Sequence, residues 1–416
     1  MIDIGEAQRQ VLEEIPVLGT ERIHILEALG RVLAHEVRAT RDIPMCDNSA
    51  MDGYACRHED VAGASSARPV RLRLIGEAPA GKPFSGIVGP GEIVRITTGG
   101  VIPDGADTVI MVENTELAGE LVAVFADPGR GAYIRPAGED VKSGEVVLHP
   151  GHVIRPAEIG MLATLGKAYI HAFQRPIVAI LSTGGELVDL DEPLTRGKVV
   201  CSNTYSLAAQ VLECGAIPLS LGIASDDEED QRSKIYEGLR ADCIITSGGV
   251  SVGKYDLVKG TLSKIGMKAK FWKVAMKPGK PLVFGTIGTK PVFGLPGNPT
   301  SAMISFEQFV RPALLKMMGH RRIFRPTIEA VLGEEVSSVP GRLHLARCKL
   351  VREDGKVKAL STGTQSSGAL KSMVLADGLM ILPPVRESFP LGEKVQAQLL
   401  HSSTPLTEDS PFWTRN

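Results

Sequence analysis

The spacing of hydrophobic and polar residues divides the chain into stretches of different secondary structure. In the first stretch the apolar residues recur at helical intervals: Ile4, Ala7, Val11, Leu12 and Ile15. Asp3 and Glu6 have the spacing of a capping box, in which each side chain bonds a free backbone N–H at the start of a helix. Pro16 follows and ends the pattern. The pattern predicts an amphipathic N-terminal helix.

A second apolar stripe with helical spacing runs through residues 21–34 and predicts another helix. From about residue 43 to 135 the pattern changes to short alternating segments, such as 70–76 and 92–97, between turns rich in Gly and Pro. Alternation with period two is typical of half-buried strands, so this region is predicted to be a β-rich domain. Helical spacing returns near residues 157–166.

The second half of the chain has two further patterns. Between Pro176 and about Gly319, short apolar runs alternate with helical stripes, which indicates a mostly parallel sheet covered on both faces. After Arg322 the segments TIEAVL, LHLARCKLV, KVKAL and EKVQAQLL are candidate strands of a small barrel or sandwich. The predicted fold class is therefore multidomain α/β plus β, in which the α/β part is a doubly wound parallel sheet.

Composition limits the class of partner. The 416 residues are 43% hydrophobic and 23% charged and have a net charge of -2, so no general positive field attracts nucleic acid or an anionic membrane. The six cysteines include no C-x-x-C pair, which argues against a zinc site or a disulfide framework and fits a reducing compartment. The acidic N-terminus is unlike a secretory signal, and no apolar run approaches the roughly 18 residues of a membrane span. We expect a cytoplasmic protein.

Charged residues follow the buried strands of the predicted parallel sheet. The carboxyl ends of such strands meet at one edge, where helix N-termini and free backbone N–H groups converge. Three acids and three lysines follow strands in this region: Glu186, Asp226, Asp256, Lys273, Lys277 and Lys280. Neighbouring carboxylates repel one another unless a cation such as Mg²⁺ or nearby lysines neutralise them. The combination is typical of a site that holds a phosphorylated ligand.

Glycines follow one of these strands in the segment SGGVSVG. Gly248, Gly249 and Gly253 leave backbone N–H groups free to bind phosphate or another oxyanion ahead of a helix. A tight connection between a strand and a helix has the same pattern, so the segment by itself allows both interpretations.

Several candidate residues also have a purely structural interpretation. Asp226 precedes a helix and is placed to act as its N-cap. Thr97 and Thr98 end an apolar strand, where hydroxyl pairs are typical of turns. For Lys280, simple exposure to solvent is as compatible with the sequence as contact with a ligand.

Five motifs occur in order over nearly the whole chain: DNSAMDGYA at 47–55, STGGEL at 182–187, SGGVSVGKYD at 247–256, FWKVAMKPGKP at 271–281 and GLPGNP at 294–299. Together they resemble the molybdopterin molybdenumtransferase family, which includes the corresponding domain of gephyrin. The resemblance implies a transferase of molybdenum cofactor biosynthesis.

The resemblance also implies the domain organisation and the oligomeric state. An N-terminal helix (1–20) packs on the pterin-binding domain, and residues 21–42 and 137–172 form a discontinuous domain with helices. The remaining parts are a β-rich domain (43–136), the doubly wound α/β pterin-binding domain (173–320), a small C-terminal β barrel (321–403) and a disordered tail (404–416). The implied assembly is a homodimer with a site shared between its subunits.

The implied reaction transfers molybdenum from molybdate to the dithiolene of adenylated molybdopterin and releases AMP, giving molybdenum cofactor. Mg²⁺ on Glu186, Asp226 and Asp256 is expected to assist cleavage of the pyrophosphate. The resemblance assigns functional roles to these acids and to Asp52, Thr98, Lys273, Lys277, Arg347 and Ser367. It assigns substrate binding to Ser247, Gly248, Gly249, Val250, Ser251, Pro296, Gly297, Asn298 and Pro299. Asp52 is expected to act across the dimer interface, and the pterin adenylyltransferase is a candidate partner.

The chain departs from the family pattern at three positions. Gly185 stands where STGDEL carries an acid, which removes one carboxylate from the predicted metal site. Lys254 stands where an acid is common, and Cys348 where a glycine often follows the arginine.

Two other functions are alternatives to the transferase. A gephyrin-like non-catalytic scaffold is expected to carry a second fused domain and a long disordered linker. A molybdopterin adenylyltransferase is a single α/β domain, so the β-rich and C-terminal parts of this chain argue against that activity.

Overall fold

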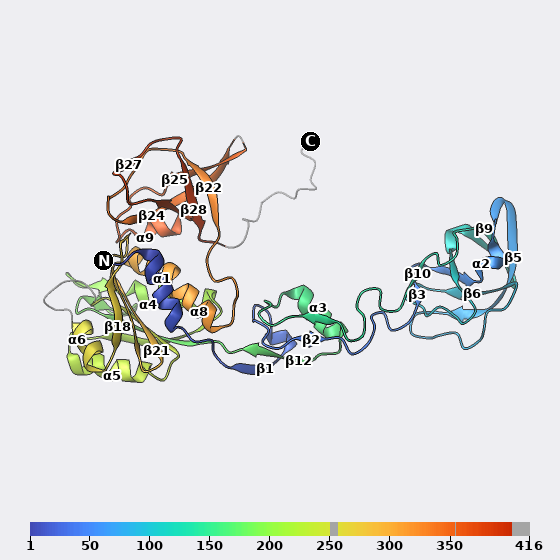
Figure 1. The fold of residues 1–416 in the computed structure, drawn as a ribbon, viewed down its shortest axis with the longest axis horizontal. Coiled ribbons are helices and arrows are strands. Elements are labelled where there is room, and N and C mark those ends of the chain that lie inside the picture. Colours follow the sequence, from blue (N-terminus) through green and yellow to red (C-terminus); the bar gives the residue numbers. More distant parts are fainter. Residues whose placement is uncertain (250–256, 354, 402–416) are drawn as a thin grey trace. The chain divides into compact units, whose positions relative to one another are not determined.

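The structure, a computed structural model, describes residues 1–249, 257–353 and 355–401 (Figure 1). The chain forms two compact units. Unit 1 contains residues 1–34, 151–155 and the chain from residue 170 onward, and unit 2 contains residues 35–150 and 156–169. No helix in the described part of the chain has the length and apolar character that crossing a membrane requires.

Unit 1 contains a six-stranded mixed sheet. Its strand order is β16 (Ile217–Ala224), β13 (Ile177–Thr183), β17 (Cys243–Ser247), β21 (Lys290–Leu295), β20 (Pro281–Ile287) and β18 (Lys268–Lys273). The first four strands are parallel, and β20 and β18 are antiparallel to their neighbours. This arrangement confirms the mostly parallel sheet predicted from the short apolar runs.

Helices cover both faces of this sheet. Along β13, Val178 and Ile180 pack with Leu207 of α4 (Ser202–Glu213), whereas Ala179 faces the other side and packs with Ile235 of α5 (Glu228–Gly238). Helices α1 (Ile4–Glu14), α7 (Pro299–Ser305) and α8 (Arg311–Met317) lie on the α4 side, and α6 (Leu257–Lys264) lies with α5 (Figure 1). The sheet is therefore doubly wound, because successive residues of a strand point to opposite faces.

The C-terminal region forms a closed five-stranded barrel. Its strands follow the order β24 (Leu343–Glu353), β25 (Lys356–Ser361), β22 (Thr327–Leu332), β28 (Lys394–Leu399) and β26 (Gly378–Leu382), and β26 pairs again with β24. The short elements around it are β23 (Val336–Ser337), β27 (Ser388–Phe389) and α9 (Leu370–Val374). A two-residue strand, β19 (Met276–Lys277), pairs in parallel with β24 and joins the barrel to the segment that follows β18. The small barrel expected from the sequence is confirmed.

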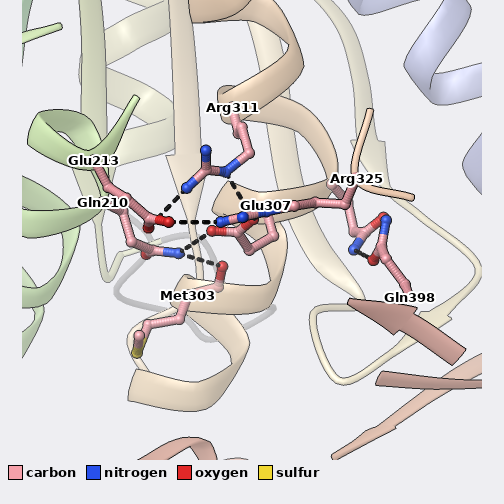
Figure 2. Close-up of polar contacts among 8 residues, drawn as sticks. Gln210, Glu213, Met303, Glu307, Arg311, Arg325 and Gln398 are labelled. Carbon is pink, nitrogen blue, oxygen red and sulfur yellow. Dashed lines mark hydrogen bonds and ion pairs between the residues drawn. The ribbon is translucent and has the colours of Figure 1, made fainter. Parts of the chain in front are cut away.

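A buried charge network ties the linker before the barrel to the α/β part. Helices α7 and α8 are joined by a π-helical turn (Phe306–Val310) that carries Glu307. The Glu307 carboxylate accepts hydrogen bonds from Arg311 (2.8 Å), Arg325 (3.1 Å) and Gln210 of α4 (2.9 Å), as Figure 2 shows. Glu213, at the end of α4, pairs with both arginines. The network therefore joins α4, the π-helical turn and the linker.

Unit 2 is built on a second six-stranded sheet, as the alternating pattern predicts. Its order is β7 (Thr108–Met111), β4 (Gly53–Cys56), β6 (Glu92–Ile96), β5 (Ser65–Ala78), β9 (Leu121–Ala126) and β8 (Thr115–Ala118). The smaller elements are β2 (Val37–Arg38) with β11 (Val146–Leu148), β3 (Asn48–Ser49) with β10 (Ile134–Arg135), helices α2 (His58–Val61) and α3 (Pro156–Thr164), and a 3-10 turn (Val112–Asn114). Helix α3 confirms the helical spacing near residues 157–166.

The helix predicted over residues 21–34 is wrong. The segment forms β1 (Thr20–His24), which pairs with β12 (Tyr169–Phe173), followed by one 3-10 turn (Ile25–Glu27). Leu26 is 76% exposed, so the apolar stripe has no continuous buried face. Gly30 has a φ of 75° and donates its N–H to Ile154, which directs the chain away from a helix. Tertiary pairing overrides the local spacing here.

The predicted N-terminal helix forms, but half of its predicted capping box does not. Asp3 caps α1 by accepting from the N–H groups of Gly5 and Glu6. The Glu6 side chain instead bonds Arg9 and Gln10 on the exposed face of the helix. An ion pair one turn along the helix thus replaces the return bond.

Candidate functional site

A pocket of about 590 Å³ lies at the carboxyl ends of the parallel strands of unit 1. It is lined by the ends of β13 and β17, the turn after β21 and the start of α4. The predicted site residues that line it are Glu186, Asp226, Ser247, Gly248, Gly249, Pro296, Gly297, Asn298 and Pro299. The pocket brings together residues more than 100 positions apart because adjacent parallel strands end at the same edge. Val250, Ser251 and Asp256 lie outside the described residues.

The glycine turn after β17 requires glycine on steric grounds. Gly248 and Gly249 have φ angles of 94° and 64°, and a Cβ atom on Gly248 would lie 2.3 Å from the Thr183 carbonyl oxygen. The Gly248 N–H donates to the carbonyl of Leu295 (3.1 Å), the last residue of the neighbouring strand. The turn therefore lies tightly against β13 and β21, and this one N–H is not available to a ligand.

The two acids in the described pocket lie on neighbouring turns. Glu186 follows β13 and precedes β14 (Leu187–Val188), which pairs with β15 (Val199–Val200). Asp226 follows β16, and its Oδ2 accepts a hydrogen bond from the Gly185 N–H (3.0 Å). A Cβ atom on Gly185 would lie 2.6 Å from that oxygen, so the glycine lets the Asp226 carboxylate approach the STGGEL turn.

The structure excludes one of the two interpretations of Asp226, the helix cap. The N-cap of α5 is Asp227, whose side chain accepts from the Asp230 N–H (2.9 Å). Asp226 is therefore not needed as a helix cap and instead faces the pocket.

Carboxylate oxygens are suitable ligands for a hard divalent cation. Glu186 and Asp226 supply two such groups to the pocket, and the third predicted ligand, Asp256, lies outside the described residues. Among the residues that the structure describes, no cluster of three or more His, Cys, Asp or Glu side chains is arranged to hold a metal ion.

Ser367, from the barrel, does not line the pocket but is hydrogen-bonded to a residue of its rim. The Asn298 side-chain amide donates to Ser367 Oγ (2.9 Å), and the Thr300 N–H donates to the Ser367 carbonyl (3.1 Å). Because Asn298 lines the pocket, these two bonds hold the loop of Ser367 at its edge.

Arg347 is fully buried beneath the same loop. Its guanidinium donates to Ser372 Oγ (3.0 Å) and to the carbonyls of Thr364 (3.1 Å) and Ser366 (3.0 Å). Nη1 is buried and has no hydrogen-bond partner among the described residues. Burial lowers the pKa of Arg347 to about 10. Arg347 therefore supports the loop that carries Ser367 and retains one unpaired donor.

Lys277 belongs to a cluster of cationic side chains between β19 and β24. It stands opposite His344 in the strand register. Burial, and then repulsion from Arg342 and Arg347, lowers the pKa of Lys277. Burial, and then the charge of Lys277, lowers the pKa of His344 to about 4. An anion bound here would relieve this repulsion.

Lys273 ends β18 with an exposed side chain. Neither Lys273 nor Lys277 lines the pocket.

Unit 2 brings together Asp52 and Thr98, two residues 46 positions apart. Oδ1 of Asp52 accepts from the Thr98 N–H (2.7 Å) and from the Thr98 hydroxyl (3.0 Å). These bonds, the backbone bond first, lower the pKa of Asp52. Both side chains are exposed. Thr98 therefore holds the exposed Asp52 carboxylate in place through two hydrogen bonds and favours its ionised form.

Thr98→Val is expected to raise the pKa of Asp52 while leaving it below its ordinary value. The variant removes the hydroxyl donor and keeps the stronger backbone donor. An NMR titration of the Asp52 carboxyl carbon measures the change. Thr97→Val is the matched control, because the Thr97 hydroxyl accepts from the Ala80 N–H instead. Equal shifts in both variants would contradict the assigned role of Thr98.

Sequence reasoning missed Asn203. It lies in the first turn of α4, lines the pocket and is only 7% exposed. Its amide bonds Ser247 and Gly297, which belong to two different strand ends. Asn203 lies at the start of a helix and not after a strand, so the position that marks the other site residues in the sequence does not mark this one. Its only sequence signal is a polar residue at the N-terminus of an otherwise apolar helical stripe.

Three family matches cover the chain in order. Residues 2–166 match the MoeA N-terminal region (domain I and II), residues 179–316 a probable molybdopterin binding domain, and residues 329–400 the MoeA C-terminal region (domain IV). The pocket at the ends of β13, β17 and β21 lies within the second match.

Named relatives cover nearly the full length. The molybdopterin molybdenumtransferase of Haemophilus influenzae is 36% identical over 401 residues, which is 95% of this chain and 98% of the relative. The Bacillus subtilis enzyme of the same name is 34% identical, with 96% and 94% covered. The crystal structure of the molybdopterin biosynthesis MoeA protein from Pyrococcus horikoshii matches with a TM-score of 0.84 and 31% identity, covering 97% of this chain and all of that chain.

The fold, the pocket and these matches define a transferase of molybdenum cofactor biosynthesis. The chain belongs to the molybdopterin molybdenumtransferase family, also called MoeA. The resemblance identified from the five sequence motifs is confirmed.

Proposed function

We propose that this protein inserts molybdenum from molybdate into the dithiolene of adenylated molybdopterin and releases AMP, giving molybdenum cofactor. The observation that carries the proposal is the pocket at the carboxyl edge of the sheet, with two acids, a glycine turn and a barrel serine hydrogen-bonded to its rim. Its volume of about 590 Å³ is typical of sites for small ligands.

The pterin and the phosphates are proposed to bind between two turns. Ser247, Gly248 and Gly249, with Val250 and Ser251 beyond them, form one wall. The other wall is the segment from Pro296 to Pro299, which leads into α7. Pro296 and Pro299 have no backbone N–H, and the Thr300 N–H is bonded to the Ser367 carbonyl, so the N–H groups of Gly297 and Asn298 are the ones proposed to contact the phosphates from this wall.

Mg²⁺ is proposed to bind at Glu186 and Asp226, with Asp256 as a third ligand. The two carboxylates in the described pocket fit a cation that prefers oxygen ligands. When bound, Mg²⁺ would neutralise charge on the pyrophosphate oxygens. The backbone bond from Gly185 orients Asp226 for this role.

Molybdate is proposed to bind near Lys277, Arg347 and Ser367. Lys273 is proposed as a further cationic residue of the same site. The support is chemical, because Lys277 and Arg347 repel one another and Arg347 retains a buried unpaired donor. Charge-assisted hydrogen bonds to such groups are the strong contacts for an oxyanion.

Asp52 and Thr98 are proposed to serve the pocket of the neighbouring subunit in a homodimer. Mixing two inactive variants, Asp52→Ala and Lys277→Ala, tests this directly. A shared site restores activity, because one site of each mixed dimer then has both residues intact, whereas unshared sites stay inactive.

The pterin adenylyltransferase is proposed as the partner that supplies the pterin. The six free cysteines favour a reducing location such as the cytoplasm.

An assay with purified protein tests the reaction. Adenylated pterin and Mg²⁺ are supplied with and without molybdate, and AMP release is measured. Release that depends on molybdate supports the proposal. Release that is the same without molybdate contradicts it, and consumption of unmodified pterin with ATP would identify an adenylyltransferase instead.

A further inference from the structure

The side-chain amide of Asn203 joins the two walls of the pocket. Nδ2 donates to Ser247 Oγ at the end of β17 (2.8 Å) and to the Gly297 carbonyl in the turn after β21 (2.8 Å). The carbonyl of Gly297 only accepts hydrogen bonds, so the donor nitrogen of the amide must face it. This chemistry, and not a choice of rotamer, defines the orientation of Asn203.

The bonds continue past Asn203. The Ser247 hydroxyl accepts from Asn203 and donates to the Pro296 carbonyl (3.3 Å), so two adjacent carbonyls of the second wall are bonded from this side. The strands themselves are neighbours, with Ser247 opposite Leu295. Gly297 approaches so closely that a Cβ atom on it would lie 3.5 Å from the Gly248 Cα. Asn203 therefore adds a third element, α4, to two turns that already touch.

The second wall also carries the barrel. Asn298 follows Gly297 directly, and its amide holds Ser367 Oγ at 2.9 Å. A shift of the Gly297 carbonyl therefore moves both the surface proposed to bind the pterin and the support of Ser367. Asn203 is in a position to keep these two parts of the site aligned.

We propose that Asn203 is a positioning residue, which sets the spacing between the Ser247–Gly249 turn and the Pro296–Pro299 turn and thereby the affinity of the pocket for the pterin. The inference rests on the proposed function for the identity of the ligand. It adds a residue to which neither the motifs nor the strand ends pointed.

Asn203→Leu and Asn203→Asp test the proposal. Leucine keeps the approximate volume and removes both donors, whereas aspartate keeps the shape and cannot donate to the Gly297 carbonyl. Equilibrium binding of molybdopterin is measured by pterin fluorescence, and KM and kcat are measured in the AMP-release assay. We expect about tenfold weaker pterin binding in each variant and a matching rise in KM that exceeds the change in kcat.

Gln210→Met is the matched control. Gln210 lies on the same helix, is 6% exposed and also donates two hydrogen bonds, to Met303 and Glu307 (Figure 2). It does not line the pocket. We expect this variant to lose thermal stability comparably to Asn203→Leu while binding molybdopterin like the wild type.

The outcomes separate the two proposals. Wild-type pterin affinity in either folded Asn203 variant, or an equal loss of affinity in Gln210→Met, overturns the role of Asn203. If Asn203→Leu does not fold, Asn203→Asp carries the test alone. Pterin binding by the wild type without AMP release would instead overturn the proposed reaction and leave the binding comparison intact.

Discussion

Replacing Glu307 by alanine is expected to destabilise unit 1 by about 3–5 kcal/mol. The side chains of Glu307, Arg311 and Arg325 are 4%, 8% and 7% exposed, so the charges have little access to water. Burial opposes the charge of Arg325, yet the carboxylates of Glu307 and Glu213 keep its pKa above the ordinary value. Without Glu307, the two buried guanidiniums have Glu213, which is 49% exposed, as their one carboxylate partner among the described residues.

Chemical denaturation followed by tryptophan fluorescence measures this loss, since Trp272 lies in β18 of the same unit. The matched control is Glu329→Ala, which breaks an ion pair with Lys394 whose side chains are 71% and 56% exposed. An exposed pair of this kind is screened by water and contributes little to stability. Similar losses in the two variants would show that the buried network does not hold the linker.

Arg347→Ala is expected to lower kcat/KM for molybdate by roughly 10- to 150-fold, equivalent to about 1.5–3 kcal/mol for a lost charge-assisted hydrogen bond. The variant removes the unpaired Nη1 donor proposed to face the oxyanion. It also removes three bonds that hold the loop of Ser367. Pterin binding is expected to change less than twofold by comparison, because Arg347 does not line the pocket.

Arg347→Lys separates charge from geometry. Lysine keeps the positive charge but lacks the planar fork that reaches Ser372, Thr364 and Ser366 together. If Arg347→Lys partly recovers kcat/KM for molybdate, the loss in Arg347→Ala is due to the missing charge. If it recovers nothing, the loss is due to the missing bonds to the loop of Ser367. Arg352→Ala, on the exposed end of β24, is the control. Unchanged molybdate dependence in Arg347→Ala would limit Arg347 to a structural role.

Most of the secondary structure of unit 1 followed from hydrophobic spacing. The short apolar runs became β13, β17 and β21, because continuous burial on both faces produces such runs in parallel strands. The stripe over residues 21–34 had comparable spacing and formed no helix, since pairing with β12 and the backbone of Gly30 decided its conformation. Spacing predicts an element reliably only where the matching apolar face is actually buried.

Some residues of the candidate site could likewise be predicted from the sequence, and others could not. Glu186 and Asp226 were found by their position after strands, because the topology of a parallel sheet brings such positions to one edge. Asn203 was not found, because its role depends on bonds to Ser247 and Gly297, which come from strands far away in the sequence.

The amino-acid sequence by itself determined the alternation of strands and helices in the doubly wound part of unit 1, the family and the edge of the sheet at which charged residues gather. These properties depend on residue type and local spacing, which are present in any single chain. Only the tertiary structure decided that Asp227 caps α5 while Asp226 faces the pocket, and that Glu307 is buried between two arginines. Such choices depend on which distant groups become neighbours, and burial then makes each hydrogen bond or charge pair far more important than its position in the sequence indicates.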